Sequence, residues 1–157
     1  GKIILDVGCG FGDLFAFLTE KYGADFQYIG LDISSSLIEQ AKVKYAAKNA
    51  TFYQGELFSF KSLHSEPVDY IVESGMLSFK IENNNDYAQQ IMNEMFALAS
   101  EGIALNFLTD NVDYQLEKNH HFSTQDVMTW ASKLSNNFVL YHDYPLWEFT
   151  AKILKNR

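Results

Sequence analysis

The hydrophobic and polar residues of this chain follow two periods, one typical of strands and one typical of helices. Short apolar runs rich in β-branched and aromatic residues predict buried strands. These runs lie at residues 3–7, 26–32, 51–54, 68–72 and 102–108. Between them, apolar residues recur every three or four positions, as on one face of an amphipathic helix. The alternation of strands and helices predicts an α/β fold with a parallel sheet.

The last part of the chain departs from this alternation. Residues 138–143 and 147–154 are two strand-like runs that only a three-residue segment, Tyr144-Pro145-Leu146, separates. So short a connection joins antiparallel strands, because parallel strands need a long crossover. We therefore predict a doubly wound, mostly parallel, seven-stranded sheet between two layers of helices, with an antiparallel C-terminal strand.

The first predicted strand runs directly into a glycine-rich loop, in the stretch Ile3-Ile4-Leu5-Asp6-Val7-Gly8-Cys9-Gly10-Phe11-Gly12-Asp13. Glycines let the backbone turn sharply and let a ligand approach main chain that a Cβ would otherwise block. The helix that follows points its unpaired N–H groups and the positive end of its dipole at the same place. This strand–loop–helix pattern predicts a nucleotide-binding site.

Two carboxylates near the loop indicate which nucleotide it binds. A dinucleotide-binding loop has its third glycine at the position where this chain has Asp13, and a further acid, Asp6, ends the strand. Two carboxylates would repel a pyrophosphate, but they suit a ligand that carries a cationic group and no phosphate. S-adenosyl-L-methionine, with its ammonium and sulfonium, fits that description. A dinucleotide site and a purely structural turn are the alternatives.

The run Asp6-Val7-Gly8-Cys9-Gly10-Phe11-Gly12 closely resembles the first motif of class I S-adenosylmethionine-dependent methyltransferases. The resemblance extends over essentially the whole chain. It includes the antiparallel last strand, which distinguishes the methyltransferase sheet from the dehydrogenase sheet. It implies one Rossmann-like, three-layer α/β/α domain over residues 1–157. Methyltransferases of this type usually carry a helical segment before the first strand, so we expect that a native N-terminal segment is missing.

Acidic residues also end the next predicted strands. Asp32 lies 22 residues after Gly10. At this distance a nucleotide-binding unit places the carboxylate that accepts hydrogen bonds from both ribose hydroxyls. A surface strand end is the alternative. We expect Ile33 to stack on the adenine, and the resemblance implies that Glu56 and the backbone of Leu57 contact the adenine edge. For Glu56, a solvated loop position is the alternative. The cofactor-binding residues expected in all are Asp6, Gly8, Cys9, Gly10, Gly12, Asp32, Ile33, Glu56, Leu57, Glu73 and Ser74.

Residues 109–122 interrupt the pattern with a polar stretch that carries aromatic side chains and follows a strand's carboxyl end. This position suits a loop or lid that contacts the methyl acceptor, and a long connector is the alternative. The candidate catalytic residues here are Tyr114, His120 and His121. A histidine is the natural base if the acceptor is a hydroxyl or a carbon acid, and a plain surface position is its alternative.

The charge of the chain indicates which kind of methyl acceptor it binds. The net charge is −8, and the single arginine is the last residue, Arg157. Clustered lysines and arginines bind phosphate backbones, and the sequence has no such cluster. It also lacks the N/D-P-P-Y/F signature of amino methyltransferases that act on nucleic acids. We therefore expect a small-molecule acceptor and no nucleic-acid partner.

Other classes of site and partner are not indicated. Cys9 is the single cysteine, so it forms no internal disulfide. No metal site is expected, because residues 83–86 read as a turn and helix cap before a helix that starts near Tyr87, not as a calcium loop. No apolar run is long enough to cross a membrane and no signal peptide is visible, which predicts a cytoplasmic protein without membrane contact. The sequence carries no signal for an oligomeric state.

The function that we predict is an S-adenosyl-L-methionine-dependent methyltransferase. Two alternatives come from other classes. One is a non-catalytic protein that binds the same cofactor, and the less favoured one is an NAD-binding oxidoreductase.

Overall fold

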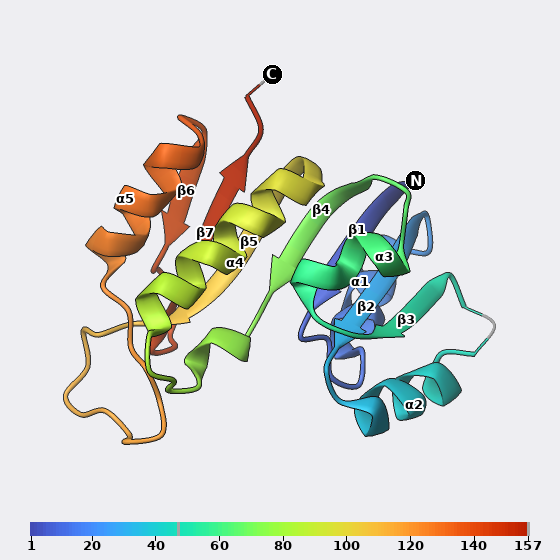
Figure 1. Cartoon of the computed structure of the whole chain (residues 1–157), viewed down its shortest axis with the longest axis horizontal. Coiled ribbons are helices and arrows are strands. Elements are labelled where there is room, and N and C mark those ends of the chain that lie inside the picture. Colours follow the sequence, from blue (N-terminus) through green and yellow to red (C-terminus); the bar gives the residue numbers. More distant parts are fainter. Residues whose placement is uncertain (47, 157) are drawn as a thin grey trace.

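The computed structural model describes residues 1–46 and 48–156, and its centre is a seven-stranded sheet with helices on both faces (Figure 1). The strands follow the order β3-β2-β1-β4-β5-β7-β6 across the sheet. Their bounds are β1 (Lys2–Val7), β2 (Phe26–Asp32), β3 (Ala50–Gln54), β4 (Val68–Glu73), β5 (Ala99–Leu108), β6 (Phe138–Tyr141) and β7 (Glu148–Leu154).

The sheet has the predicted doubly wound, Rossmann-like topology. Strands β1 to β5 pair in parallel, and the strand order reverses between β1 and β4. Strand β7 inserts between β5 and β6 and pairs antiparallel with both. The prediction of an antiparallel C-terminal strand is therefore confirmed.

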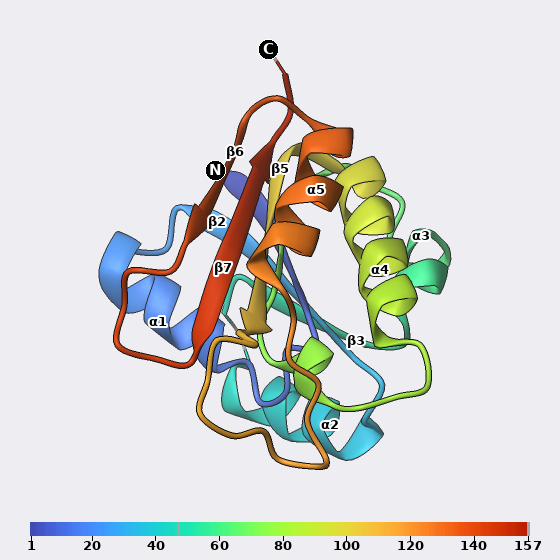
Figure 2. The ribbon, with the colours of Figure 1, turned by 90° about the vertical axis from the view of Figure 1, so that its left-hand side faces the viewer.

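Helices cover the two faces of the sheet as separate layers, as Figure 2 shows for α1 on one side and α4 and α5 on the other. One core lies where apolar residues of α1 and α2 meet β2 and β3, and includes Phe15, Ile38 and Phe52. A larger core lies where α4 and α5 cover the opposite face. The helices are α1 (Asp13–Tyr22), α2 (Ser35–Lys44), η1 (Leu57–Ser59), α3 (Phe60–Leu63), η2 (Met76–Ser78), α4 (Asn84–Leu98) and α5 (Thr124–Leu134).

The start of α4 differs from the sequence-based expectation. The helix begins at Asn84, so residues 84–86 form its first turn instead of a turn that precedes it. The side chain of Asn84 is buried, accepts the Ile81 N–H at 2.8 Å and donates to the Phe79 carbonyl at 2.8 Å. An asparagine that favours turns can thus begin a helix, because its amide holds the preceding loop.

Residues 109–122 form a loop whose two ends lie side by side. The N–H of Phe122 donates to the Leu108 carbonyl at 2.8 Å, and the N–H of Asp110 donates to the Phe122 carbonyl at 3.0 Å. Further along, Asn119 forms an isolated antiparallel bridge with Phe79, which follows η2. Closed ends of this kind are typical of compact surface loops with a function.

The described part of the chain contains neither a membrane-spanning helix nor a metal-binding cluster. No helix there is long and apolar enough to cross a membrane. No group of three or more His, Cys, Asp or Glu side chains in the same residues is arranged to hold a metal ion.

Candidate active site

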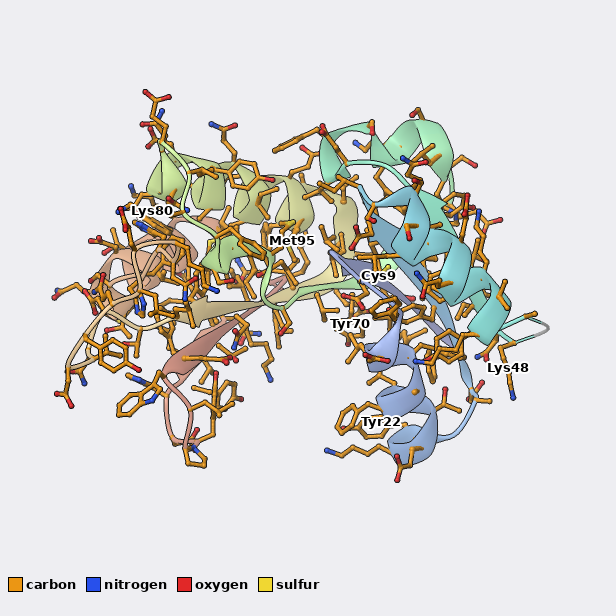
Figure 3. All side chains as sticks on the ribbon, turned by 90° about the horizontal axis from the view of Figure 1, so that it is seen from below. Cys9, Tyr22, Lys48, Tyr70, Lys80 and Met95 are labelled. Carbon is orange, nitrogen blue, oxygen red and sulfur yellow. The ribbon has the colours of Figure 1, made fainter. Side chains whose placement is uncertain are left out.

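A cavity of about 540 Å³ lies at the carboxyl ends of β1, β2 and β4, where the strand order reverses. Doubly wound α/β sheets bind ligands at this switch point. Figure 3 looks onto this edge of the sheet, with Cys9 in the loop after β1 and Lys80 in the segment after η2. The expected cofactor residues that line the cavity are Gly8, Gly10, Asp32, Ile33, Glu56, Leu57 and Ser74. Asp6, Cys9, Gly12 and Glu73 lie outside its lining.

The carboxylate of Asp32 is the central polar group of the cavity. One of its oxygens accepts the Gly10 N–H at 2.9 Å, and the other accepts the Ser34 N–H at 2.9 Å. Each carboxylate oxygen can accept two hydrogen bonds, so both keep a lone pair for a ligand. Asp32 therefore fixes the glycine loop and can also accept hydrogen bonds from the hydroxyls of a ribose.

Two glycines leave open main chain at the wall of this cavity. Gly10 and Gly75 have positive φ angles of 52° and 96°, and a Cβ added at either would meet nothing within 4 Å. A side chain there would project into the space where a ligand approaches the backbone. The third glycine of the loop, Gly12, is required by close packing, since an added Cβ would lie 2.9 Å from the Phe52 ring.

The lining of the cavity fits S-adenosylmethionine better than a dinucleotide. Among the described residues, neither lysine nor arginine lines it. Ile33 and Leu57 supply apolar surface for an adenine, and Asp32 supplies a negative charge. A cationic ligand without phosphate matches this combination, whereas a pyrophosphate would find no positive side chain.

The two carboxylates that the sequence places near the loop do not face the cavity. Asp13 is exposed and forms an ion pair of 2.7 Å with Lys44 of α2. Asp6 is buried below the loop, where its carboxylate accepts the Tyr28 hydroxyl at 2.5 Å. Burial raises the pKa of Asp6 to about 6, a change that the Tyr28 hydrogen bond opposes and the nearby Asp32 increases.

Glu73, at the end of β4, is also buried and supports the cavity from below. One carboxylate oxygen accepts the N–H groups of Met76 at 2.7 Å and Leu77 at 3.2 Å, while the other has no hydrogen-bond partner among the described residues. Burial, with a smaller contribution from the nearby Asp6, raises the pKa of Glu73 to about 8. Glu73 thus holds the η2 turn, which carries Met76 into the cavity lining.

Cys9 has no sign of chemical reactivity. Its side chain is buried in the core between α1 and β2. Burial raises the pKa of the thiol to about 12, so the reactive thiolate does not form at neutral pH.

Several cavity residues were not expected from the sequence. The α4 residues Tyr87 and Ile91 complete the wall, together with Met76 and Phe79. Tyr87 and Ile91 are four positions apart and therefore share a helix face. This spacing was available in the sequence, but it does not distinguish a cavity wall from ordinary core.

The adjacent candidate histidines make different contacts. His120 Nε2 lies 3.1 Å from the Asn85 side-chain oxygen, and its ring packs edge-on against Phe122. Burial lowers the pKa of His120. His121 Nδ1 lies 2.6 Å from the Thr109 carbonyl oxygen. His121 also lines a second cavity, of about 180 Å³, which it shares with Tyr114 and with Trp147 of the β6–β7 connection.

Comparisons with known proteins agree with this geometry. Residues 1–151 match the family model of a methyltransferase domain. A protein of Mycobacterium tuberculosis that is named as a methyltransferase is 24% identical over 97% of this chain and 92% of its own length. An mRNA cap guanine-N(7) methyltransferase of Schizosaccharomyces pombe is 44% identical over a match that covers 36% of this chain and 16% of that protein.

Among solved structures, magnesium protoporphyrin IX methyltransferase of Synechocystis PCC 6803 with bound S-adenosylhomocysteine has the same fold. The TM-score is 0.76 with 16% identity, over 99% of this chain and 75% of the other. With the family model and the predicted glycine loop in agreement, the chain belongs to the methyltransferase domain family and is a class I S-adenosylmethionine-dependent methyltransferase.

Proposed function

We propose that this methyltransferase transfers the methyl group of S-adenosylmethionine to a small-molecule acceptor that binds beside the loop of residues 109–122. The cofactor, when bound, supplies an electrophilic methyl on a sulfonium. Asp32 would accept the ribose hydroxyls, and Ile33 and Leu57 would flank the adenine. The backbone of the β1 and β4 loops would hold the methionine part. The chain's contribution is then to position both reactants and to exclude water.

The observation that carries the proposal is the second cavity, of about 180 Å³, which the loop of residues 109–122 helps to line. An isolated β-bridge connects the walls of the two cavities, because Phe79 lines the first and its bridge partner Asn119 lines the second. An acceptor in the second cavity would therefore lie next to the cofactor. The lining is apolar and aromatic apart from Asp113, Asn119 and His121, and this combination suits a small organic molecule.

The charge of the chain supports a small acceptor over a nucleic acid. The net charge is −8, and an acidic protein does not attract a polyanion. The names of the similar proteins include both an RNA cap and a tetrapyrrole as acceptors, so similarity by itself leaves the acceptor open. The size of the second cavity supports a smaller group than a tetrapyrrole.

Two experiments test this proposal. Calorimetry with S-adenosylhomocysteine and, separately, with NADH should show binding of the first and no binding of the second. The protein is then incubated with isotopically methyl-labelled S-adenosylmethionine and either a metabolite extract or capped RNA. Label in a small metabolite is the expected result, and label in RNA would overturn the assignment of the acceptor.

A further inference from the structure

The main chain holds the His121 imidazole in one tautomer. A carbonyl oxygen only accepts hydrogen bonds, so the contact of 2.6 Å with the Thr109 carbonyl requires that Nδ1 carries the proton. In the neutral ring the lone pair then lies on Nε2. Thr109 is itself fixed, since it is buried and its N–H donates to the Trp147 carbonyl at 3.0 Å. The end of β5 therefore presets a basic nitrogen at the second cavity.

The adjacent His120 has a different role. Its backbone N–H donates to the Ser78 carbonyl at 3.0 Å, and its ring nitrogen Nε2 contacts the Asn85 side chain. It lies outside the lining of the second cavity. His120 thus attaches the loop to η2 and α4, while His121 faces the cavity.

The walls of the second cavity indicate what it holds. Tyr114 and Trp147 are 76% and 69% exposed. Burial of large aromatic side chains is favourable in free energy, so two exposed ones in one cavity indicate a surface that a ligand covers. Leu108 and Val112 add apolar surface. A volume of about 180 Å³ corresponds to roughly six water molecules of about 30 Å³ each, which is enough for one substituted ring.

We propose that His121 is the general base of this enzyme and that the acceptor is a hydroxyl compound with a single-ring apolar body. This inference rests on the proposed function and names its substrate class. In the transfer, the hydroxyl proton passes to Nε2 of His121, and the hydroxyl oxygen forms a bond to the methyl carbon. The carbon–sulfur bond breaks with its electron pair on sulfur, which leaves a neutral thioether. His121 afterwards returns the proton to solvent.

The preset base favours a hydroxyl over an amine as the nucleophile. A neutral amine already has a free lone pair and can lose its proton after the transfer. A neutral hydroxyl is a weak nucleophile until its proton is removed, so a positioned base accelerates its reaction. An amine acceptor is therefore one of the outcomes that the test must distinguish.

The first measurement uses the protein without any ligand. Nitrogen-15 NMR of the imidazole should show the His121 ring as the Nδ1–H tautomer. A ring in the Nε2–H form would overturn the proposal, because it would leave no basic nitrogen toward the cavity.

The second measurement uses phenol and 4-methylphenol as probes, with aniline for comparison. Saturation-transfer NMR should show that both phenols bind the S-adenosylhomocysteine-loaded protein and that Trp147→Ala weakens this binding. With S-adenosylmethionine, the phenols should be methylated on oxygen. Absence of binding and methylation for both phenols, or methylation of aniline in their place, would overturn the acceptor class.

The third measurement compares variants. His121→Gln keeps an amide N–H for the Thr109 carbonyl but has no base, so kcat should fall about 10²- to 10⁴-fold. KM for phenol and the affinity for S-adenosylhomocysteine should change little. His142→Asn, in the exposed β6–β7 connection, is the matched control with unchanged turnover. Normal turnover by His121→Gln would overturn its role and leave the proposed function intact, whereas loss of S-adenosylhomocysteine binding by the unmodified protein would refute the proposed function itself.

Discussion

The hydroxyl of Tyr28, in β2, donates a hydrogen bond of 2.5 Å to the buried carboxylate of Asp6, at the end of β1. In the parallel register Tyr28 pairs with Ile4 and Asp6 pairs with Gly30, so the two side chains are neighbours on the same face of the sheet. Asp6 lies directly before the glycine loop. The pair therefore anchors the base of the cofactor loop inside the core.

Tyr28→Phe should destabilise the protein by about 1.5–3 kcal/mol at pH 8, the range for a hydrogen bond to a charged group. The bond favours the ionised carboxylate, so its loss should raise the pKa of Asp6 above its present value of about 6. The destabilisation should be smaller at pH 5, where Asp6 is already mostly protonated. Urea unfolding at the two pH values measures both effects.

Tyr70→Phe is the matched control for this substitution. Tyr70 pairs with Ile4 from the other side of β1, and Figure 3 marks its place on the sheet. Within the described residues its hydroxyl donates to no side chain or carbonyl. The change should therefore cost no more than about 0.5 kcal/mol. Equal losses from both substitutions would argue against a special role for the Tyr28–Asp6 bond.

Asp32→Ala should weaken binding of S-adenosylhomocysteine by about 2–4 kcal/mol, because two ribose hydroxyls would lose a charged acceptor in a partly buried site. Calorimetry gives the affinity directly. Asp13→Ala removes a carboxylate that lies near the loop but pairs with Lys44 outside the cavity. It should leave the affinity within about twofold of the unmodified protein, since an exposed ion pair contributes little. Unchanged binding by Asp32→Ala would mean that this carboxylate does not hold the ribose.

Gly10→Val should abolish binding of S-adenosylhomocysteine while the fold is kept. Gly10 and Gly23 both have positive φ, of 52° and 77°, and open space where a Cβ would lie. Valine at either place should cost about 1–3 kcal/mol of backbone strain. Gly23 caps the end of α1 and lies outside the cavity lining, so the Gly23→Val protein should lose stability and still bind S-adenosylhomocysteine. A thermal melt and calorimetry on both variants separate strain from steric exclusion; loss of binding in both would refute the steric explanation.

Glu73→Gln should remove a pH dependence from the stability. Burial raises the pKa of Glu73 from 4.5 to about 8. Between these values the folded protein keeps a proton that the unfolded chain has released, so stability should fall as pH rises, by up to about 1.4 kcal/mol per pH unit. The buried Asp6 contributes in the same direction only up to about pH 6. Urea unfolding from pH 6.5 to 8 should therefore show a steeper fall for the unmodified protein than for Glu73→Gln, and parallel curves would contradict the assignment.

The strand–loop–helix unit at the start of the chain could be predicted from sequence because its signals are local. The apolar run of β1, the alternate glycines and the amphipathic α1 all lie within residues 2–22. The position of Asp32 followed from the known length of such a unit. The C-terminal hairpin was also a local signal, since the connection of β6 to β7 is too short for a crossover.

Other features depended on contacts between residues far apart in the sequence, which only the tertiary structure decides. Periodicity placed Tyr28 in a strand, but its partner Asp6 follows from the pairing of β2 with β1. The burial of Glu73 depends on the helices and the turn that cover the end of β4. A strand-end acid has the same local sequence signal whether it is solvated or covered, so its burial and raised pKa could not be predicted.

The different contacts of His120 and His121 could not be predicted from the local sequence either. His120 and His121 are adjacent, polar and in one loop, so local sequence cannot rank them. Their roles differ because the loop returns to the end of β5, where the Thr109 carbonyl fixes one ring and Asn85 of α4 contacts the other. Trp147 joins the same cavity from the residue just before β7, where its carbonyl accepts the Thr109 N–H only because β7 pairs with β5 in the folded sheet. The local sequence determined where the cofactor loop lies, and the long-range pairing of strands decided which side chains line the cavity that we propose for the acceptor.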